Sequence, residues 1–164
     1  MFTVPALPQI HEGLRDMAFG DISRAIGGQS VMGGFILAAC FIDYMAGFWH
    51  GPKEKGERDG DIYQDFLREF LPMYNAEKLY SDLRCRLVHN YSEGGSFIFA
   101  HEFPDRHLTR AENGKVYVNL ENFVEELRVA LDRLLHLVDS DGDVQLRAIM
   151  RWREHGILVP KQKA

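Results

Sequence analysis

The chain has 164 residues, enough for one domain with a substantial single core. Its 46% apolar and 26% charged residues are typical of a folded globular protein and exclude a disordered or fibrous one. The net charge of −5 gives no support for a broadly basic nucleic-acid surface, although it does not exclude a local basic patch.

Hydrophobic spacing predicts four helices in the first half of the chain, at about 9–26, 30–50, 62–71 and 76–91. Asp61 and Asn75 are the expected N-caps of the third and fourth helices. The charged, glycine-rich segment 51–61 is expected to form an exposed loop. The helix at 30–50 is apolar enough to resemble a membrane span, but Asp43 interrupts it, so we expect a core helix and no membrane.

The pattern changes to period two at 96–103, and Asn113-Gly114 further along suits a tight turn. We therefore expect an antiparallel β-hairpin insert over about 96–119. Asn119 is the expected N-cap of a long amphipathic helix that reaches Val138, and a last helix is expected at about 143–155. The predicted fold is mainly α, a bundle of about five to six helices with this hairpin, in a single domain over 1–164.

Two cysteines, Cys40 and Cys85, stand in apolar helical patterns without CxxC spacing. Such thiols are usually buried and reduced, which favours a cytoplasmic protein. The first ten residues, "MFTVPALPQI", have no basic segment and contain two prolines, so we expect no secretory leader.

A charged motif interrupts the apolar pattern of the fourth helix, in "SDLRCRLVHNY" (81–91). At about 100° per residue, Arg84 falls within the apolar stripe, while Arg86 and His89 face the other side. A guanidinium in a core keeps its charge and needs a partner. Asp43, the lone acid of the apolar second helix, is the expected partner in a structural ion pair.

Arg84 and His89 do not converge in one straight helix, because five residues separate them by about 140°. They could act together if the helix loosens near Asn90 or if Arg84 curls around the helix. A second subunit that contributes the same pair across a two-fold axis would also bring them together.

An arginine, four residues and then a histidine, late in a helix of a small bundle, resembles the HEPN superfamily; here the motif is "RCRLVH" (84–89). The resemblance extends over roughly 9–138 and implies a homodimer in which the motif faces its twin. It also implies RNA as a partner and a metal-independent endoribonuclease activity. In that activity His89 would handle protons and Arg84 would hold the scissile phosphate, with Arg86 and Asn90 supporting them.

Two other functions stay open. The chain could be a non-catalytic module for an unknown protein partner, with Arg84 and Asp43 as scaffold, or it could bind a small ligand between helices. The nuclease needs an accessible His89 near an arginine, the interaction module needs an exposed apolar patch, and the ligand module needs a deep cavity. We expect no cofactor and no metal, because the histidines match no standard ligand spacing.

Overall fold

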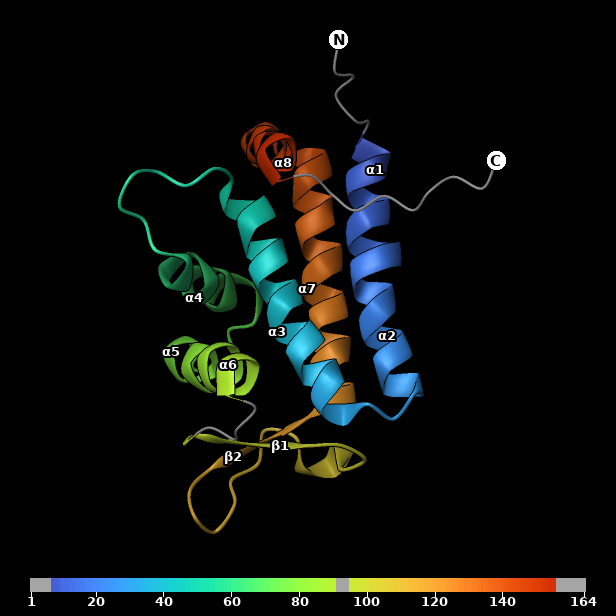
Figure 1. Cartoon of the computed structure of the whole chain (residues 1–164), viewed down its shortest axis with the longest axis vertical. Helices are drawn as coiled ribbons and strands as arrows, with labels where there is room; N and C mark the ends of the chain where they lie inside the picture. Colours follow the sequence, from blue (N-terminus) through green and yellow to red (C-terminus); the bar gives the residue numbers. More distant parts are fainter. Residues whose placement is uncertain (1–6, 91–94, 156–164) are drawn as a thin grey trace.

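The computed structural model describes residues 7–90 and 95–155 and is mainly helical, with one small sheet (Figure 1). The segments η1 and η2 are π-helical and η3 is a 3₁₀ turn. In chain order the elements are α1 (Leu7–Glu12), η1 (Gly13–Phe19), α2 (Gly20–Gly27), α3 (Val31–His50), α4 (Asp59–Phe70), α5 (Ala76–Leu79), η2 (Tyr80–Leu87), α6 (Val88–Asn90), β1 (Phe97–Ala100), η3 (Pro104–Arg106), β2 (Val116–Asn119), α7 (Leu120–Ser140) and α8 (Gly142–His155).

The long helices lie side by side, and the remaining elements surround them (Figure 1). The continuous helix α1–η1–α2, α3 and α7 form the upright layer, and α8 packs against α3 and α7. The helices α4 and α5–η2–α6 cross this layer on one side, with the sheet below them. By length and composition α3 could span a membrane, but 56% of its most apolar window is buried inside the protein, as in a core helix.

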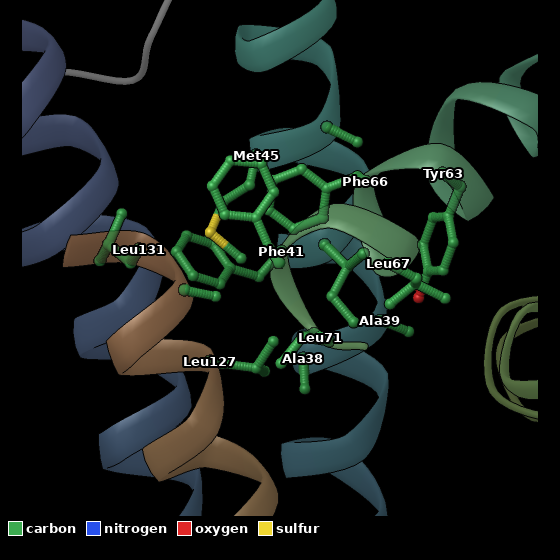
Figure 2. Packing of buried hydrophobic residues seen from close by; sticks show 14 of the residues in the cluster. Ala38, Ala39, Phe41, Met45, Tyr63, Phe66, Leu67, Leu71, Leu127 and Leu131 are labelled. Atoms are coloured by element: carbon green, nitrogen blue, oxygen red, sulfur yellow. The ribbon is translucent and has the colours of Figure 1, made fainter. Parts of the chain in front are cut away.

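The core is built where α3 meets α4 and α7 (Figure 2). Small side chains on α3 let the neighbouring helices approach closely, and aromatic rings fill the space around them. Phe66 and Phe70 of α4 stack with ring centroids 4.4 Å apart. The buried residues labelled in Figure 2 are Ala38, Ala39, Phe41, Met45, Tyr63, Phe66, Leu67, Leu71, Leu127 and Leu131.

The predicted antiparallel hairpin is wrong, because β1 and β2 pair in parallel, with Phe97 opposite Val116 and Ala100 opposite Asn119. The turn at 113–114 does form, and Gly114 takes the positive φ of 81° expected of it. It pairs β2 with the segment 108–111 instead, through bonds such as Leu108 N–H to the Tyr117 carbonyl at 2.8 Å. Residues 101–107 reverse the chain first, so β1 reaches the other edge of β2 in the parallel sense.

The predicted helix ends agree with the structure at some caps and differ at others. Asn75 is the N-cap of α5, where its Oδ1 accepts from Lys78 N–H at 2.9 Å. The predicted N-cap Asp61 is wrong, since α4 already begins at Asp59 and Asp61 lies in its first turn. The predicted end of the fourth helix at 91 lies outside the described residues. The last helix, predicted at about 143–155, is α8 at Gly142–His155.

Asn119 precedes α7 as predicted, but its side chain does not cap that helix. Its Oδ1 accepts from Phe103 N–H at 3.0 Å, which ties the segment between the strands to the start of α7. The side-chain amide of Asn119 therefore stabilises the segment between the two strands and does not cap the helix.

Candidate functional site

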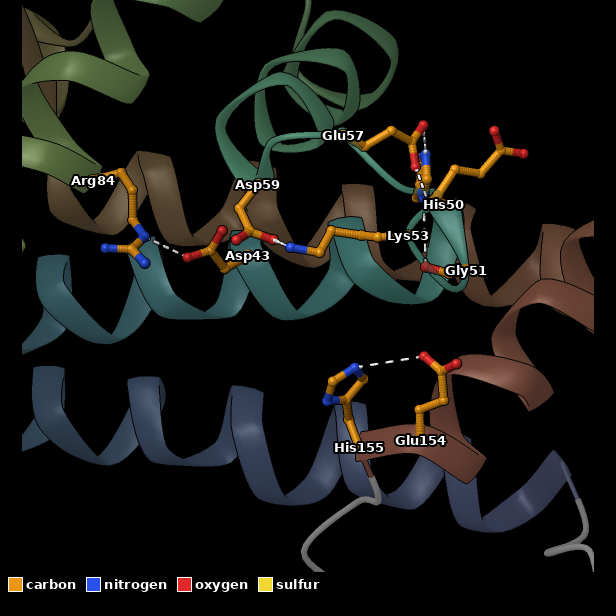
Figure 3. A network of polar contacts seen from close by, with 10 residues as sticks. Asp43, His50, Gly51, Lys53, Glu57, Asp59, Arg84, Glu154 and His155 are labelled. Atoms are coloured by element: carbon orange, nitrogen blue, oxygen red, sulfur yellow. Dashed lines mark hydrogen bonds and ion pairs between the residues drawn. The ribbon is translucent and has the colours of Figure 1, made fainter.

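The structure brings Asp43 of α3 and Arg84 of η2 together across the bundle (Figure 3). Arg84 Nε donates to Asp43 Oδ2, and the two side chains are only 26% and 30% exposed for Arg84 and Asp43 respectively. Each charge is therefore partly withdrawn from water and compensated by the other. The pair joins the core helix to the helix that carries the motif.

His89 lies against the same guanidinium, with Arg84 Nη1 3.1 Å from His89 Nε2. An arginine only donates hydrogen bonds, so Nε2 of His89 accepts and the imidazole carries its proton on Nδ1. His89 is exposed to solvent. One chain thus supplies a charged guanidinium and an accessible imidazole base side by side.

The divergence of Arg84 and His89 expected in a straight α-helix does not arise, because η2 is not a regular α-helix. A π-helical segment closes its turns with i→i+5 hydrogen bonds, so a residue and the fifth one after it come to the same face. Val88 N–H donates to the Leu83 carbonyl, which is such a bond directly before the Arg84–His89 step. The wider turn removes most of the rotation that a straight helix would impose.

A cavity of about 290 Å³ opens beside the ion pair. Its lining includes Cys40 and Tyr44 of α3 together with Lys53, Arg84 and Arg151. Lys53 Nζ lies 3.0 Å from Asp59, next to Asp43 in Figure 3. Three cationic side chains therefore border a space that also holds two carboxylates.

Burial and the opposite charge of the partner shift the pKa values of Asp43 and Arg84 in opposite directions. Burial raises the pKa of the Asp43 carboxyl above its ordinary value, and the Arg84 guanidinium opposes this rise without cancelling it. Burial alone would lower the pKa of Arg84, but the hydrogen bond to Asp43 and the negative charge of that carboxylate, with smaller contributions from Cys40 and Tyr63, together raise that pKa. The guanidinium therefore stays charged at the site.

Tyr63 of α4 lies beneath this pair and is fully buried. Its ring lies 5.3 Å from that of Tyr80, and its hydroxyl finds no hydrogen-bond partner within the described ranges. Burial raises the pKa of the Tyr63 hydroxyl well above its ordinary value, and Asp43 adds to the effect. A neutral, fully buried ring therefore lies near the ion pair, and such low-polarity surroundings strengthen charge interactions.

Asp82 is the residue that sequence reasoning missed, because in a regular helix it shares the outer side with Arg86. In the structure it is 3% exposed and accepts backbone N–H bonds from Gly95, Ser96 and Phe97 at 3.2, 2.7 and 3.2 Å. The carboxylate fixes the chain that follows the motif onto η2. A lone acid two residues before Arg84 was the only sequence signal for this role.

The other two supporting residues of the motif differ in how far the structure describes them. Arg86 is exposed to solvent on η2. Asn90 ends α6, and only its backbone lies within the described part of the chain. Arg86 is therefore placed for a ligand that approaches from solvent.

One side of α3 next to the motif carries two exposed residues, Leu37 and Cys40, and the partly buried Tyr44; it is called here the outer α3 face (Leu37, Cys40 and Tyr44). The expectation that both thiols are buried is wrong for Cys40, which is exposed, whereas Cys85 is partly exposed. Three-and-four spacing places the members of the face on one stripe. Cys40 and Tyr44 also line the cavity beside Arg84, so the face and the site are continuous.

A second polar cluster, at His107, holds the segment between the strands in place. Its Nδ1 accepts from Asn119 N–H at 3.1 Å, so its Nε2 carries the proton and donates to Glu126 at 3.0 Å. Glu126 also accepts from the hydroxyl of Tyr74. Both ring nitrogens are engaged, and no group of three His, Cys, Asp or Glu suited to a metal occurs among the described residues.

Comparison with protein-family models, with curated proteins and with solved structures finds no match to this chain.

Proposed function

We propose that this chain is a HEPN-like helical-bundle protein of the cytoplasm that binds RNA and cleaves it without a metal. The contact between Arg84 and His89 carries this proposal, because it joins a phosphate-binding cation to a proton acceptor in one exposed position. A histidine titrates near neutral pH and suits proton transfer. The planar fork of an arginine suits the oxygens of a phosphate.

The chemistry would use the 2′-hydroxyl of the RNA itself. The Arg84 guanidinium turns from His89 Nε2 to the phosphate, and the freed Nε2 takes the hydroxyl proton. The 2′-oxygen forms a bond to the adjacent phosphorus, and the bond from phosphorus to the 5′-oxygen breaks. The leaving 5′-oxygen takes a proton from an acid, which the same histidine of a second copy supplies. Arg84 stabilises the negative charge that develops on the phosphate, and Asp43 fixes the guanidinium through Nε. The products are a 2′,3′-cyclic phosphate and a 5′-hydroxyl.

The second copy is proposed to dock on the outer α3 face. That face is the apolar surface next to Arg84, and its members are continuous with the cavity at the ion pair. A two-fold contact there would bring the two motifs toward each other and cover Leu37 and Cys40. Homodimer formation is therefore part of the proposed function.

The burial of the ion pair also favours a second function, a small-ligand or protein-binding module without catalysis. The bond between Asp43 and Arg84 couples α3 to η2 whether or not RNA binds. In that case the cavity of about 290 Å³ beside the pair would take a small anion, because its described lining has three cations, Lys53, Arg84 and Arg151, against the two carboxylates of Asp43 and Asp59. Thermal-shift measurements with small anions and no dependence on His89 would favour this alternative.

The test is the cleavage of end-labelled single-stranded RNA by the purified chain. His89→Ala should lower the rate about 10²–10⁴-fold, the usual contribution of acid–base catalysis. His136→Ala is the matched control, because His136 is an exposed histidine on α7 away from the motif, and it should leave the rate unchanged. Equal cleavage by the wild type and His89→Ala, or no cleavage by the wild type, would contradict the proposal.

A further inference from the structure

A second and larger cavity, of about 470 Å³, lies between the start of α5 and the strand region and is called here the sheet groove. Its walls come from the α4–α5 connection, from the residues just before and within β1, and from the turn before β2. Figure 1 shows this region below α5 and α6, at the opposite end of the molecule from the loop between α3 and α4. Its size is in the range of pockets that hold a nucleotide-sized ligand.

The described lining of the groove is richer in cationic than in anionic side chains, although the protein carries a net charge of −5. Lys78, Arg110 and Lys115 line it, and its described lining contains no aspartate or glutamate. The nearest acid along α5, Glu77, reaches toward Arg68 instead, at 3.7 Å. A concave surface with one sign of charge concentrates ligands of the opposite sign.

The remaining lining suits a nucleic-acid strand better than a bare inorganic anion. Met73 and Leu108 are exposed apolar side chains in the groove, and the backbone at Gly95 and Gly114 contributes small surfaces beside them. Sugars and bases can lie on such apolar surface while the cations hold phosphates. The aromatic rings among the described lining residues, Tyr74 and Phe97, are buried, so we expect little sequence preference from them.

Hydrogen bonds connect the wall of the sheet groove to η2, the segment that carries Arg84. Asp82 of η2 holds the N–H groups of Gly95 and Ser96, and both residues line the groove. Arg86 extends toward the same wall, since its Nη1 lies 4.0 Å from the position that a β-carbon would take on Gly95. Arg86 of η2 therefore adds a cationic side chain beside the wall of the groove at Gly95.

We propose that the sheet groove binds the phosphodiester backbone of the RNA strand that reaches the Arg84–His89 site, a few nucleotides from the bond that is cut. This inference rests on the proposed function for the identity of the strand. The groove supplies affinity that is independent of base sequence, and Arg84 and His89 supply the chemistry.

The experiment measures the binding of a fluorescent 2′-O-methyl oligouridine of about 12 nucleotides, which cannot be cut because its 2′-oxygen is blocked. The double variant Lys78→Gln/Arg110→Gln should bind about tenfold more weakly at low salt. The slope of log affinity against log salt should fall by about 1.4, or about 0.7 for each lost phosphate contact on a single strand. Both side chains are exposed, so the fold should be unaffected.

The matched control is Lys55→Gln/Arg153→Gln, which removes the same charge from exposed positions outside the groove and should bind like the wild type. An equal loss in the control, no loss in the groove variant, or no binding by the wild type would overturn the inference. Binding to anionic vesicles that RNA cannot displace would also overturn it, by assigning the groove to a membrane surface.

The outcomes separate this inference from the proposed function. If RNA cleavage depends on His89 while the groove variant binds normally, the function stands and the groove inference fails. If the wild type does not cleave RNA but binding depends on Lys78 and Arg110, the groove stands as a nucleic-acid site and the proposed cleavage fails.

Discussion

A double-mutant cycle on Asp43 and Arg84 measures how strongly the two helices are coupled through their charges. Asp43→Asn and Arg84→Met keep the approximate size of each side chain while they remove its charge. The free energy of unfolding is measured for the wild type, both single variants and the double variant by urea denaturation at neutral pH. The coupling free energy is the part of the double effect that the single effects do not account for.

The exposure of the pair sets the expected size of this coupling. Fully exposed ion pairs contribute about 0.2–1 kcal/mol, and removal of one partner from a buried pair costs about 3–5 kcal/mol. The side chains of Arg84 and Asp43 are 26% and 30% exposed, which lies between these cases, so we expect a coupling of about 1–2 kcal/mol. Asp43→Asn alone leaves the Arg84 guanidinium without its compensating charge, but it also removes the cost of burying a carboxylate, the cause of the raised pKa of Asp43. Its effect should therefore be smaller than the loss of one partner from a fully buried pair.

The control cycle is Glu125→Gln with Arg128→Met on α7, where the same kinds of side chain are 60% and 47% exposed. Its coupling should be about 0.3–0.5 kcal/mol, as for other exposed helix pairs. If the coupling free energy of Asp43 and Arg84 is no larger than that of Glu125 and Arg128, partial burial does not strengthen the pair.

The remaining predictions concern pH and two other buried contacts. Arg84→Met should raise the pKa of Asp43 further, because burial is then unopposed. A carboxyl with a raised pKa in the folded state stabilises the fold below its ordinary pKa and loses this stabilisation as the pH rises through the raised value. The stability deficit of Arg84→Met, measured by urea denaturation, should thus grow from acid to neutral pH, and a constant deficit would contradict this. Asp82→Ala should lower the free energy of unfolding by about 3 kcal/mol, because three backbone donors lose a charged acceptor, and a loss below about 1 kcal/mol would refute that role. Tyr74→Phe removes the hydroxyl bond to Glu126 and should cost about 1–2 kcal/mol in the same assay; an unchanged unfolding midpoint would show that the bond is not stabilising.

The helices could be predicted from the sequence because their signals are local. The apolar residues from Phe123 to Val138 have the spacing of a helix that packs on one side, and the structure contains this segment as α7. The lone charges of Asp43 and Arg84 in apolar helices indicated each other as partners, since each needs compensation when buried. The structure places both in one ion pair.

The direction of the strands and the geometry of the motif depend on information that the local sequence does not carry. Asn113-Gly114 indicates a turn, and so which segment pairs with one edge of β2. It does not indicate which strand pairs with the other edge, and in the structure that strand is β1. The rotation of about 100° per residue used for the motif holds for an α-helix only. In η2 the wider π-helical turns bring Arg84 to His89 and turn Asp82 inward. No residue type in "SDLRCRL" predicts a π-helical turn.

One π-helical segment sets Arg84 against Nε2 of His89 within a single chain. Nitrogen-15 NMR of the histidine rings, with His89→Ala used to assign the signals, measures this contact. We expect neutral His89 to carry its proton on Nδ1, and Arg84→Met to return the ring to a mixture of tautomers. A ring protonated on Nε2 in the wild type, unchanged by Arg84→Met, would contradict the contact and the proposed chemistry built on it.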